Sequence, residues 1–328
     1  MRIVVRLPNW LGDFVMSTAF IREACNAYPG AAIEVVVKQG MEALADYLPG
    51  ISKIWVFSKT AYPGLRGAWN FGKSIAATGK PDIFVCLPDS FSSAAMARAT
   101  GAEIRIGYAA ELRNLLLTKT IRKNRSLHRV DQYLALLPMF ANIHQLHPQI
   151  FLTNKSIPHP YSIIVNVNAE AVSRRLPVSK AISIINRLRA ATDADIIMIG
   201  SPKELPHVNA VFDGLANKSR IVNLAGKTDF HALANLLGGA PVMLTTDSGP
   251  MHVANALGTH TIVLFGAGNE NNTAPYNRNI STVIRYGKLP CEPCVKNVCK
   301  FGTPACLINM DEAIIVQAVL SALKRFYN

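Results

Sequence analysis

Short apolar runs alternate with longer amphipathic stretches along the whole chain. In the first half, the runs that predict strands are Arg2 to Leu7, Ala32 to Val37, Lys53 to Phe57, Asp82 to Leu87 and Glu103 to Ile106. In the second half, they are Ser162 to Asn166, Asp195 to Gly200, Arg220 to Leu224, Val242 to Thr246 and Thr261 to Phe265. Strands that alternate with helices form parallel sheets covered on both faces, so the pattern predicts an α/β fold with two doubly wound domains.

A polar, proline-containing segment between Thr153 and Tyr161 separates the two series of strands. It predicts an N-terminal domain over residues 1–155 and a C-terminal domain over 156–310, and 328 residues are enough for two cores. Because parallel sheets bind ligands beyond the carboxyl ends of their strands, we expect the two domains to face a central cleft. The terminal segment 311–328 contains one more helical pattern, which we expect to pack back on the N-terminal domain.

Composition and charge narrow the class of protein. Half of the residues are hydrophobic and 17% are charged, which excludes a disordered chain, and no apolar run of about eighteen residues predicts a membrane span. The first residues form a strand pattern that contains two arginines, so they do not resemble a signal peptide, and we expect a cytoplasmic protein. The net charge of +13 favours anionic partners, namely phosphorylated substrates, acidic lipid head groups or nucleic acid.

Several nucleotide and metal signatures are incomplete. The first strand is followed by one glycine, Gly12, where a dinucleotide fingerprint needs three, so NAD is not expected. Gly226-Lys227-Thr228 resembles the end of a phosphate loop, but Ile221 stands in the place of the first glycine. The carboxylate pair of Asp193 and Asp195 precedes a strand and therefore lies at the wrong edge for a ligand. We expect no metal and no other cofactor.

The segment LTTDSGPMH, residues 244–252, predicts an anion site. Thr246 and Asp247 end an apolar strand, and Ser248-Gly249 let the chain turn into a helix whose first amide groups can point at a phosphate. His252 lies on the first turn of that helix. A capped helix with a structural aspartate is the alternative interpretation.

Three segments, DSGPMH at 247–252, LAGKTDF at 224–230 and LPNWLGD at 7–13, together resemble glycosyltransferase family 9, the ADP-heptose:lipopolysaccharide heptosyltransferases. The resemblance extends over nearly the whole chain, with GSPKE at 200–204 between LPNWLGD and LAGKTDF. It implies a GT-B fold of two Rossmann-like domains, in which the second binds the nucleotide sugar and the first binds the acceptor.

The resemblance also implies roles for single residues. Asp13 corresponds to the family's catalytic base, and Arg174 takes the place of a lysine that neutralises the departing diphosphate, although Leu176 replaces the family's tryptophan. An N-cap role for Asp13 and a plain surface charge for Arg174 are the alternatives. The candidate donor-binding residues are Glu204, Lys227, Thr228, Thr246, Asp247, Ser248, Gly249 and His252. The candidate acceptor-binding residues are Asn9, Trp10, Gly12, Arg113 and Lys123.

The implied reaction is a direct displacement that inverts the anomeric carbon, with Asp13 as general base and no metal. The donor is an ADP-sugar, and the acceptor is an anionic, lipid-linked saccharide of the lipopolysaccharide inner core. We expect a monomer without a nucleic-acid partner, in peripheral contact with the inner face of the inner membrane. The densest basic stretch, residues 113–129, is read either as a solvated loop or as a surface for acidic ligands.

Four cysteines, Cys291, Cys294, Cys299 and Cys306, lie within sixteen residues. A zinc or iron-sulfur site is one reading, and reduced or partly paired thiols are the other, because the spacing matches no standard zinc ribbon. Two further functions stay open beside the transferase: a GT-B protein that binds a different nucleotide sugar or acceptor, or binds one without transfer, and a metal-stapled, basic nucleic-acid-binding protein. The absence of interleaved aromatic residues in 113–129 argues against the last.

Overall fold

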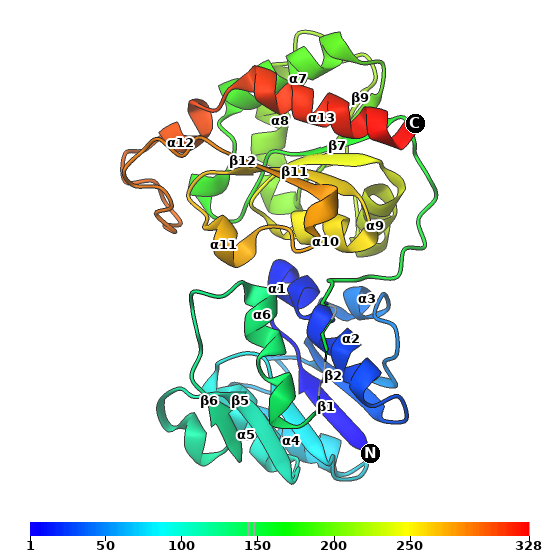
Figure 1. The fold of residues 1–328 in the computed structure, drawn as a ribbon, viewed down its shortest axis with the longest axis vertical. Helices are drawn as coiled ribbons and strands as arrows, with labels where there is room; N and C mark the ends of the chain where they lie inside the picture. Colours follow the sequence, from blue (N-terminus) through cyan, green and yellow to red (C-terminus); the bar gives the residue numbers. More distant parts are fainter. Residues whose placement is uncertain (143–144, 147, 328) are drawn as a thin grey trace. The chain divides into compact units, whose positions relative to one another are not determined.

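The computed structural model describes residues 1–142, 145–146 and 148–327. The chain divides into two compact units, Met1–Thr153 and Asn154–Asn328, so the division falls two residues before the predicted boundary at 155. Each unit holds one parallel six-stranded sheet with helices on both faces (Figure 1). The α/β fold of two doubly wound sheets is therefore confirmed.

The first unit has the strand order β3-β2-β1-β4-β5-β6. The strands are β1 Arg2–Arg6, β2 Ala32–Lys38, β3 Lys53–Phe57, β4 Ile83–Cys86, β5 Ile104–Tyr108 and β6 Lys119–Ile121. The helices are α1 Leu11–Met16, α2 Thr18–Ala27, α3 Glu42–Ala45, α4 Gly64–Ala76, α5 Phe91–Ala99 and α6 Arg129–Leu134, with 3₁₀ turns η1 Glu111–Leu115 and η2 Leu137–Met139. Helices α4 and α5 pack together on one face, and α1, α2 and α6 contact one another on the other.

The second unit has the strand order β12-β11-β10-β7-β8-β9. The strands are β7 Ser162–Asn166, β8 Asp195–Met198, β9 Ile221–Asn223, β10 Val242–Thr246, β11 His260–Phe265 and β12 Ser281–Arg285. The helices are α7 Val178–Ala191, α8 Leu205–Asp213, α9 Phe230–Gly239, α10 Gly249–Leu257, α11 Glu270–Thr273, α12 Ala305–Ile308 and α13 Glu312–Tyr327, with 3₁₀ turns η3 Val172–Arg174, η4 Pro202–Glu204 and η5 Arg278–Ile280.

The two sheets share one topology. In each, the first strand of the unit lies in the middle, the next two extend to one side and the last three to the other. The order therefore reverses between β1 and β4 in the first unit and between β7 and β10 in the second. Ligands of such sheets bind at these switch points, beyond the carboxyl ends of the strands.

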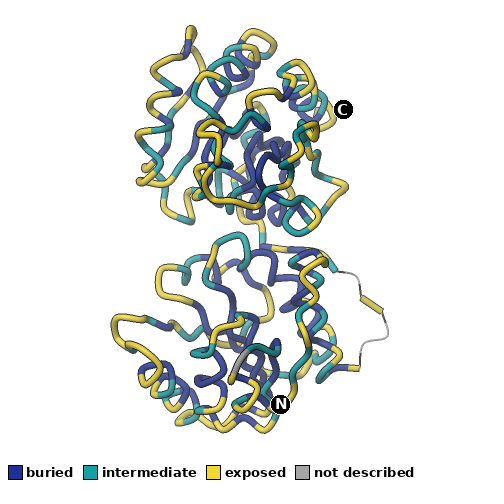
Figure 2. Tube along the Cα trace, turned by 90° about the vertical axis from the view of Figure 1, so that its left-hand side faces the viewer, coloured by how far each residue is buried: buried dark blue, intermediate teal, exposed yellow. Residues whose placement is uncertain are grey.

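Burial explains why these segments form strands. The central strands β1, β4, β7 and β10 are almost wholly buried, and Figure 2 shows buried chain at the centre of each unit with exposed loops around it. Strands that are covered on both faces read as continuous apolar runs, which is the signal that the sequence carries. The two strands that the sequence does not predict, β6 and β12, are edge strands without a fully buried residue.

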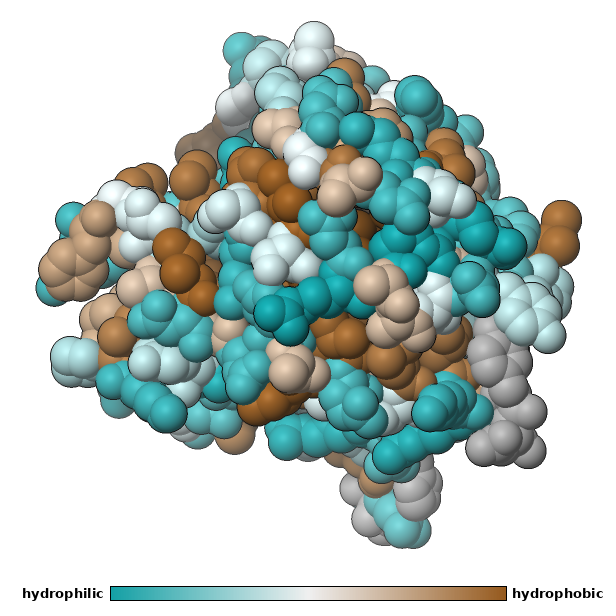
Figure 3. Space-filling view, turned by 90° about the horizontal axis from the view of Figure 1, so that it is seen from above, coloured by the Kyte–Doolittle hydropathy of each residue, from teal (hydrophilic) through white to brown (hydrophobic). Residues whose placement is uncertain are grey.

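The last helix belongs to the second unit. In α13, Ile315, Val319 and Leu323 are buried in the same core cluster as residues of α7 and α8, and Lys180 of α7 forms an ion pair of 3.1 Å with Glu312. This corrects the expectation that segment 311–328 packs on the N-terminal domain: its apolar face fills the core of its own unit. Asn328 lies outside the described residues. Seen from above, hydrophobic patches on the second unit are interrupted by hydrophilic side chains (Figure 3).

Candidate functional site

Asp13 lies beyond the carboxyl end of β1, at the switch point of the first sheet. The N-cap of α1 is Trp10, so Asp13 is not the capping residue that the alternative interpretation required. Its carboxylate instead turns towards α6, where Tyr133 Oη donates a hydrogen bond of 3.1 Å and Arg129 Nε lies at 3.3 Å from Oδ1. The side chain of Asp13 keeps 27% of its surface exposed. The arrangement holds an oriented, accessible carboxylate.

Tyr133 stays a hydrogen-bond donor under ordinary conditions. Burial raises the pKa of its phenol well above the usual value, and the nearby negative charge of Asp13 raises it further. A neutral phenol and a guanidinium therefore fix Oδ1 of Asp13. Hydrogen bonds that fix one oxygen leave the carboxylate free to accept a proton from a substrate hydroxyl on its open side.

A second carboxylate, Asp89, follows β4 on the other side of the switch point. Lys123 Nζ lies 2.6 Å from its Oδ2, and Arg113 Nη1 lies 4.0 Å from its Oδ1. Arg113 is only 1% exposed, and its three side-chain nitrogens have no hydrogen-bond partner among the described residues. Arg113 is therefore not part of a solvated loop, because its guanidinium is buried near Asp89. Its contact with an acceptor stays a prediction.

The remaining acceptor candidates surround α1. Asn9 accepts a 2.5 Å hydrogen bond from the buried guanidinium of Arg6, which also donates to the carbonyls of Leu7 and Val36. Burial lowers the pKa of Arg6 to about 10. Trp10 is 61% exposed. Gly12 is half-buried and directly precedes Asp13. Sequence reasoning missed Arg6, although an arginine at the carboxyl end of an apolar strand is a visible signal.

In the second unit, two asparagines connect the switch-point strands. Asn166, the last residue of β7, donates from Nδ2 to Ser248 Oγ at 2.8 Å and Thr245 Oγ1 at 3.2 Å. The carbonyl of Asn168 accepts from Thr246 Oγ1 at 2.5 Å, and its side-chain amide donates to Ile199 O at 3.1 Å. Sequence reasoning missed both asparagines. Their position just after a buried strand is the same signal that identified Thr246 and Asp247.

Asp247 and Arg174 form an ion pair at the end of β10. Arg174 Nη1 lies 3.0 Å from Asp247 Oδ2, and the carboxylate is only 5% exposed. Burial raises the pKa of Asp247 to about 6, against the opposing effect of the Arg174 charge. Nε of Arg174 has no hydrogen-bond partner among the described residues. That nitrogen is buried, whereas the side chain as a whole is 26% exposed and paired with a buried carboxylate, so Arg174 is not a plain surface charge.

The helix α10 begins beside this pair. Its N-cap is Ser248, whose side chain makes no capping hydrogen bond and instead receives the amide of Asn166. Pro250 in the first turn has no amide hydrogen, and the amide of Met251 donates to Ser248 O at 3.2 Å. Gly249 supplies the first helical amide group. A helix amino terminus of this kind favours a phosphate.

The carboxylate of Asp247 packs closely against Gly268, where there is no side chain. A Cβ atom on Gly268 would lie 1.9 Å from Asp247 Oδ2, so a larger residue here would force the carboxylate or the loop to shift. The loop around Gly268 is held by Arg285 of β12, which donates to Gly266 O at 2.6 Å and to Glu270 Oε1 at 2.8 Å. Neither Gly268 nor Arg285 was among the residues predicted from the sequence, because their partners lie on other elements.

The other donor candidates lie after β8 and β9. The amide of Gly226 donates to Gly200 O at 2.8 Å, which brings Lys227 and Thr228 beside the loop that leads to Glu204. Glu204 accepts from the amide of Ser201 at 2.8 Å in a capping box. One of its oxygens is thus used for the helix start, and its ribose contact stays a prediction.

His252 and Lys227 differ in accessibility. His252 is buried in α10 at 3% exposure, so its predicted contact with a phosphate stays a prediction. Lys227 is exposed, and its ammonium group lies 3.3 Å from Asn223 O.

The four clustered cysteines occupy the loop between β12 and α13 as free thiols. Cys306 in α12 is buried, and burial raises the pKa of its thiol to about 11. No group of three or more His, Cys, Asp or Glu side chains is arranged to hold a metal ion within the described part of the chain.

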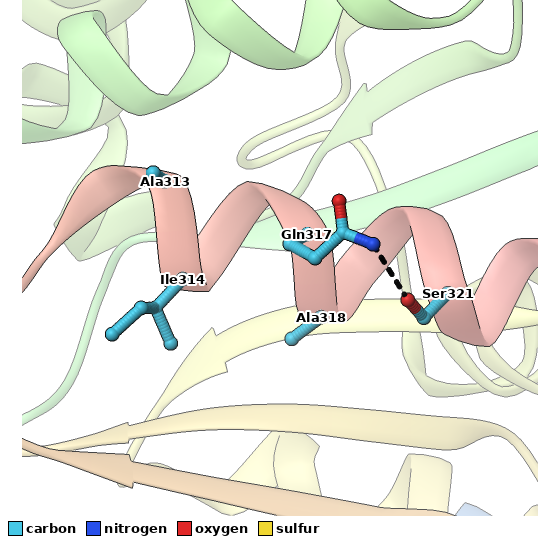
Figure 4. Close-up of a pocket in the computed structure, with 5 residues that line it drawn as sticks. All are labelled: Ala313, Ile314, Gln317, Ala318 and Ser321. Atoms are coloured by element: carbon cyan, nitrogen blue, oxygen red, sulfur yellow. Dashed lines mark hydrogen bonds between the residues drawn. The ribbon is translucent and has the colours of Figure 1, made fainter.

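A shallow hollow lies along α13, lined by Ala313, Ile314, Gln317, Ala318 and Ser321 (Figure 4). Gln317 Nε2 donates to Ser321 Oγ at 3.2 Å within it. None of the residues that line the hollow is charged, so the hollow is not the anion-binding site that the net positive charge of the protein favours. Among the described residues, no helix is long and apolar enough to cross a membrane.

Two doubly wound parallel sheets, each with its polar cluster at the switch point, define the two-domain GT-B class of glycosyltransferase. The sequence profile of glycosyltransferase family 9 (heptosyltransferase) matches residues 69–304, and the chain belongs to this family. It is 26% identical over 312 residues to lipooligosaccharide heptosyltransferase 2 of Haemophilus influenzae, covering 87% of this chain and 88% of that protein.

Two solved structures share the fold. The ADP-heptose lipopolysaccharide heptosyltransferase II of Escherichia coli aligns over all of both chains with a TM-score of 0.83 at 23% identity. The E. coli heptosyltransferase WaaC with ADP aligns over 98% of this chain and 100% of that one, with a TM-score of 0.78 at 17% identity. The chain is thus an enzyme of the heptosyltransferase family, and its curated relatives act on lipopolysaccharide or lipooligosaccharide.

Proposed function

We propose that this enzyme transfers a heptose from ADP-heptose to an inner-core saccharide of lipopolysaccharide, with inversion at the anomeric carbon. The observation that carries the proposal is the ion pair of Arg174 and Asp247 beside the first turn of α10. It places a partly exposed guanidinium beside a helix amino terminus, and the two together suit a diphosphate. The solved relative that contains ADP supports a nucleotide diphosphate as the ligand.

The first unit supplies the base. Asp13 takes the proton of the acceptor hydroxyl as its oxygen forms a bond to the anomeric carbon. The bond from that carbon to the β-phosphate oxygen breaks, the oxygen keeps the electron pair, and ADP leaves as an anion that Arg174 and the amide of Gly249 stabilise. Tyr133 and Arg129 act as positioning residues, because they hold the carboxylate of Asp13 without contacting the reacting atoms.

The remaining donor candidates bind the rest of the nucleotide. In this proposal Glu204 binds the ribose, and Lys227, Thr228, Thr246, Ser248 and His252 contact the nucleotide or its phosphates. On the acceptor side, Asn9, Trp10, Gly12, Arg113 and Lys123 bind the saccharide. The proposal includes a monomeric cytoplasmic enzyme that requires no metal or other cofactor and binds no nucleic acid.

A calorimetric titration with ADP, UDP and GDP tests the donor class without the acceptor. We expect ADP to bind at least about tenfold more tightly than the other two. A transfer assay with ADP-heptose and inner-core acceptor then tests catalysis. Binding of ADP without transfer to the acceptor would favour a nucleotide-binding protein of the same fold, and preference for UDP or GDP would contradict the donor.

A further inference from the structure

The loop between β12 and α12 (Figure 1) contacts the candidate donor site through its backbone. Val295, Lys296 and Asn297 of this loop have exposed side chains, so side-chain burial does not hold them in place. The amide of Val295 donates to Ala267 O at 2.8 Å, and the carbonyls of Lys296 and Asn297 accept hydrogen bonds from Ser173. We call residues 295–297 the clamp segment, because their backbone connects two segments that are far apart in the sequence.

Ser173 fastens the turn that carries Arg174. Its hydroxyl donates to Lys296 O at 2.5 Å and its amide donates to Asn297 O at 3.1 Å, and the residue is only 2% exposed. Within the turn η3, the amide of Arg174 donates to Ala171 O at 2.9 Å. A single 3₁₀ turn has poor hydrogen-bond geometry, so its own bonds hold it weakly. The two bonds from Ser173 therefore limit how far the backbone of Arg174 can move.

The other end of the clamp segment is bound to the loop that faces Asp247. Ala267, which accepts from Val295, directly precedes Gly268, and Gly268 packs against the carboxylate of Asp247. The carboxylate in turn lies 3.0 Å from the guanidinium of Arg174. The clamp segment thus connects the backbone on one side of this ion pair with the backbone on the other.

Arg285 anchors the start of the same loop. Its Nη1 donates to Gly266 O at 2.6 Å and lies 3.4 Å from Glu292 Oε2, which also accepts from the amide of Gly287 at 2.9 Å. The side chain of Glu292 is only 4% exposed. The loop is therefore fixed three residues before the clamp segment begins.

The backbone of Val295 is strained. Its φ is +51°, and among the described residues only Arg220 shares a positive φ without being a glycine. The left-handed region is unfavourable for a β-branched residue, which stays there only where neighbouring contacts hold it. Strain of this kind is found mainly at binding and catalytic sites. The clamp segment is therefore held in one shape, as a rigid connection between two loops requires.

We propose that Ser173 is a positioning residue of the donor site: with the clamp segment, it holds the Arg174 guanidinium where this group meets the donor diphosphate. The inference rests on the proposed function, because it concerns the same ligand. The side chain of Arg174 is 26% exposed, and it is fixed at its tip by Asp247 and at its backbone by Ser173. A guanidinium that is ordered before the ligand arrives loses less entropy on binding.

A double-mutant cycle with ADP as the ligand tests whether Ser173 acts through Arg174. Ser173→Ala removes the hydroxyl, and we expect calorimetry to show ADP binding weakened by about fivefold, the effect of one hydrogen bond. In an Arg174→Ala background, the same change is expected to alter the ADP affinity by less than about twofold, because the group that Ser173 positions is gone. A residue with a structural role alone would give equal losses in both backgrounds.

The matched control is Ser183→Ala. It removes a hydroxyl of α7 that donates to Glu312 Oε2 at 2.5 Å, outside the candidate site, and the variant should bind ADP as wild type does. Thermal unfolding of every variant is measured alongside, and the midpoint of Ser173→Ala is expected to stay close to that of Ser183→Ala.

Two variants of Val295 test the clamp segment independently, also if Ser173→Ala does not fold. Val295→Pro removes the amide that donates to Ala267 O and imposes a negative φ, so we expect ADP binding to weaken by at least about fivefold. Val295→Gly keeps the amide and adopts a positive φ without strain, so it should bind ADP as wild type does.

Two results with ADP would overturn the inference. An ADP affinity of Ser173→Ala equal to that of wild type, or a loss of the same size in the Arg174→Ala background, would contradict the role of Ser173. Equal ADP affinities of Val295→Pro and Val295→Gly would contradict the role of the clamp segment.

Inorganic pyrophosphate as a second probe separates this inference from the proposed function. A wild-type preference for UDP, or an absence of heptose transfer, would contradict the donor or the reaction, while the same cycle measured with pyrophosphate would still test Ser173. A wild-type protein that binds neither ADP nor pyrophosphate would overturn both proposals.

Discussion

The two sheets share a topology, yet their switch points have different chemistry. In the first unit the carboxylate after the switch strand, Asp13, is 27% exposed and is held by a phenol and a guanidinium. In the second unit the carboxylate, Asp247, is 5% exposed, is paired with Arg174 and precedes a helix that starts with Ser-Gly-Pro. The two switch points thus carry carboxylates of different exposure and pairing, and the proposal assigns a proton acceptor to the first and an anion site to the second.

The two carboxylates differ in their burial and in their position relative to the helix that follows the strand. The helix after β1 has six residues, and the carboxylate stands inside its first turn with one open side. The helix after β10 has nine residues, and the carboxylate stands before it, enclosed by the Gly268 loop. The fold thus places both carboxylates near switch points, while the exposure and the partners of each carboxylate differ.

The largest effect is expected from Asp13→Asn. The change keeps the shape of the side chain but removes the base, so we expect transfer to fall by at least about a hundredfold, within the range for loss of a general base. Calorimetry should show an ADP affinity close to that of wild type. The control is Asp82→Asn, at the amino end of β4, which should retain transfer. Equal losses of transfer and ADP binding would contradict the role of Asp13.

Arg174→Ala is expected to weaken ADP binding by about ten- to a hundredfold, because a charge-assisted hydrogen bond to the diphosphate is lost and Asp247 is left unpaired. Arg174→Lys should recover part of the affinity, since it restores the charge without the planar fork. Arg187→Ala removes an exposed arginine of α7 paired with Glu312 and serves as the control. An unchanged ADP affinity in Arg174→Ala would remove this residue from the site.

Asp247 should give the second unit a distinct pH dependence. Burial raises its pKa from 3.8 to about 6, so between these values the folded chain holds a proton that the unfolded chain has released. The stabilising contribution is complete below about pH 4 and is lost as the pH rises to about 6, a change of up to roughly 3 kcal/mol. Chemical denaturation of wild type and Asp247→Asn across this window should show the slope only in wild type; parallel curves would contradict the raised pKa.

The smallest effect is expected from Gly268→Ala. Its added methyl group would displace the carboxylate of Asp247, and we expect a loss of about 1–3 kcal/mol in stability together with weaker ADP binding. Gly30→Ala is the matched control, because no atom lies within 4 Å of the added group there. ADP affinity and the unfolding midpoint that both match wild type would show that the loop can move away.

Sequence patterns predicted the buried strands better than the edges. The bounds of β7 and β10 agree with the prediction, since buried parallel strands read as apolar runs between turn residues, and the edge strand β3 was also predicted with its observed bounds. The edge strands β6 and β12 were missed because they carry too few buried positions. The last helix was assigned to the wrong unit, because periodicity shows which face is apolar but not what covers it.

The candidate site residues that the sequence identifies lie close together in the chain. Asp247, Ser248 and Gly249 lie in one segment, and the carboxyl-end rule identified them. Long-range partners could not be read in this way: Tyr133 contacts Asp13 across 120 positions, and Gly268 meets Asp247 through a loop held by β12. Arg113 was expected at an acceptor surface, and its burial depends on a tertiary contact with β5 that composition cannot indicate.

The most direct test of the account is a crystal structure of the protein with ADP. We predict that the diphosphate lies within hydrogen-bonding distance of the Arg174 guanidinium and the Gly249 amide, at the carboxyl end of β10. ADP bound away from Arg174 and α10, with this edge of the sheet empty, would contradict the assignment of the second switch point as the donor site.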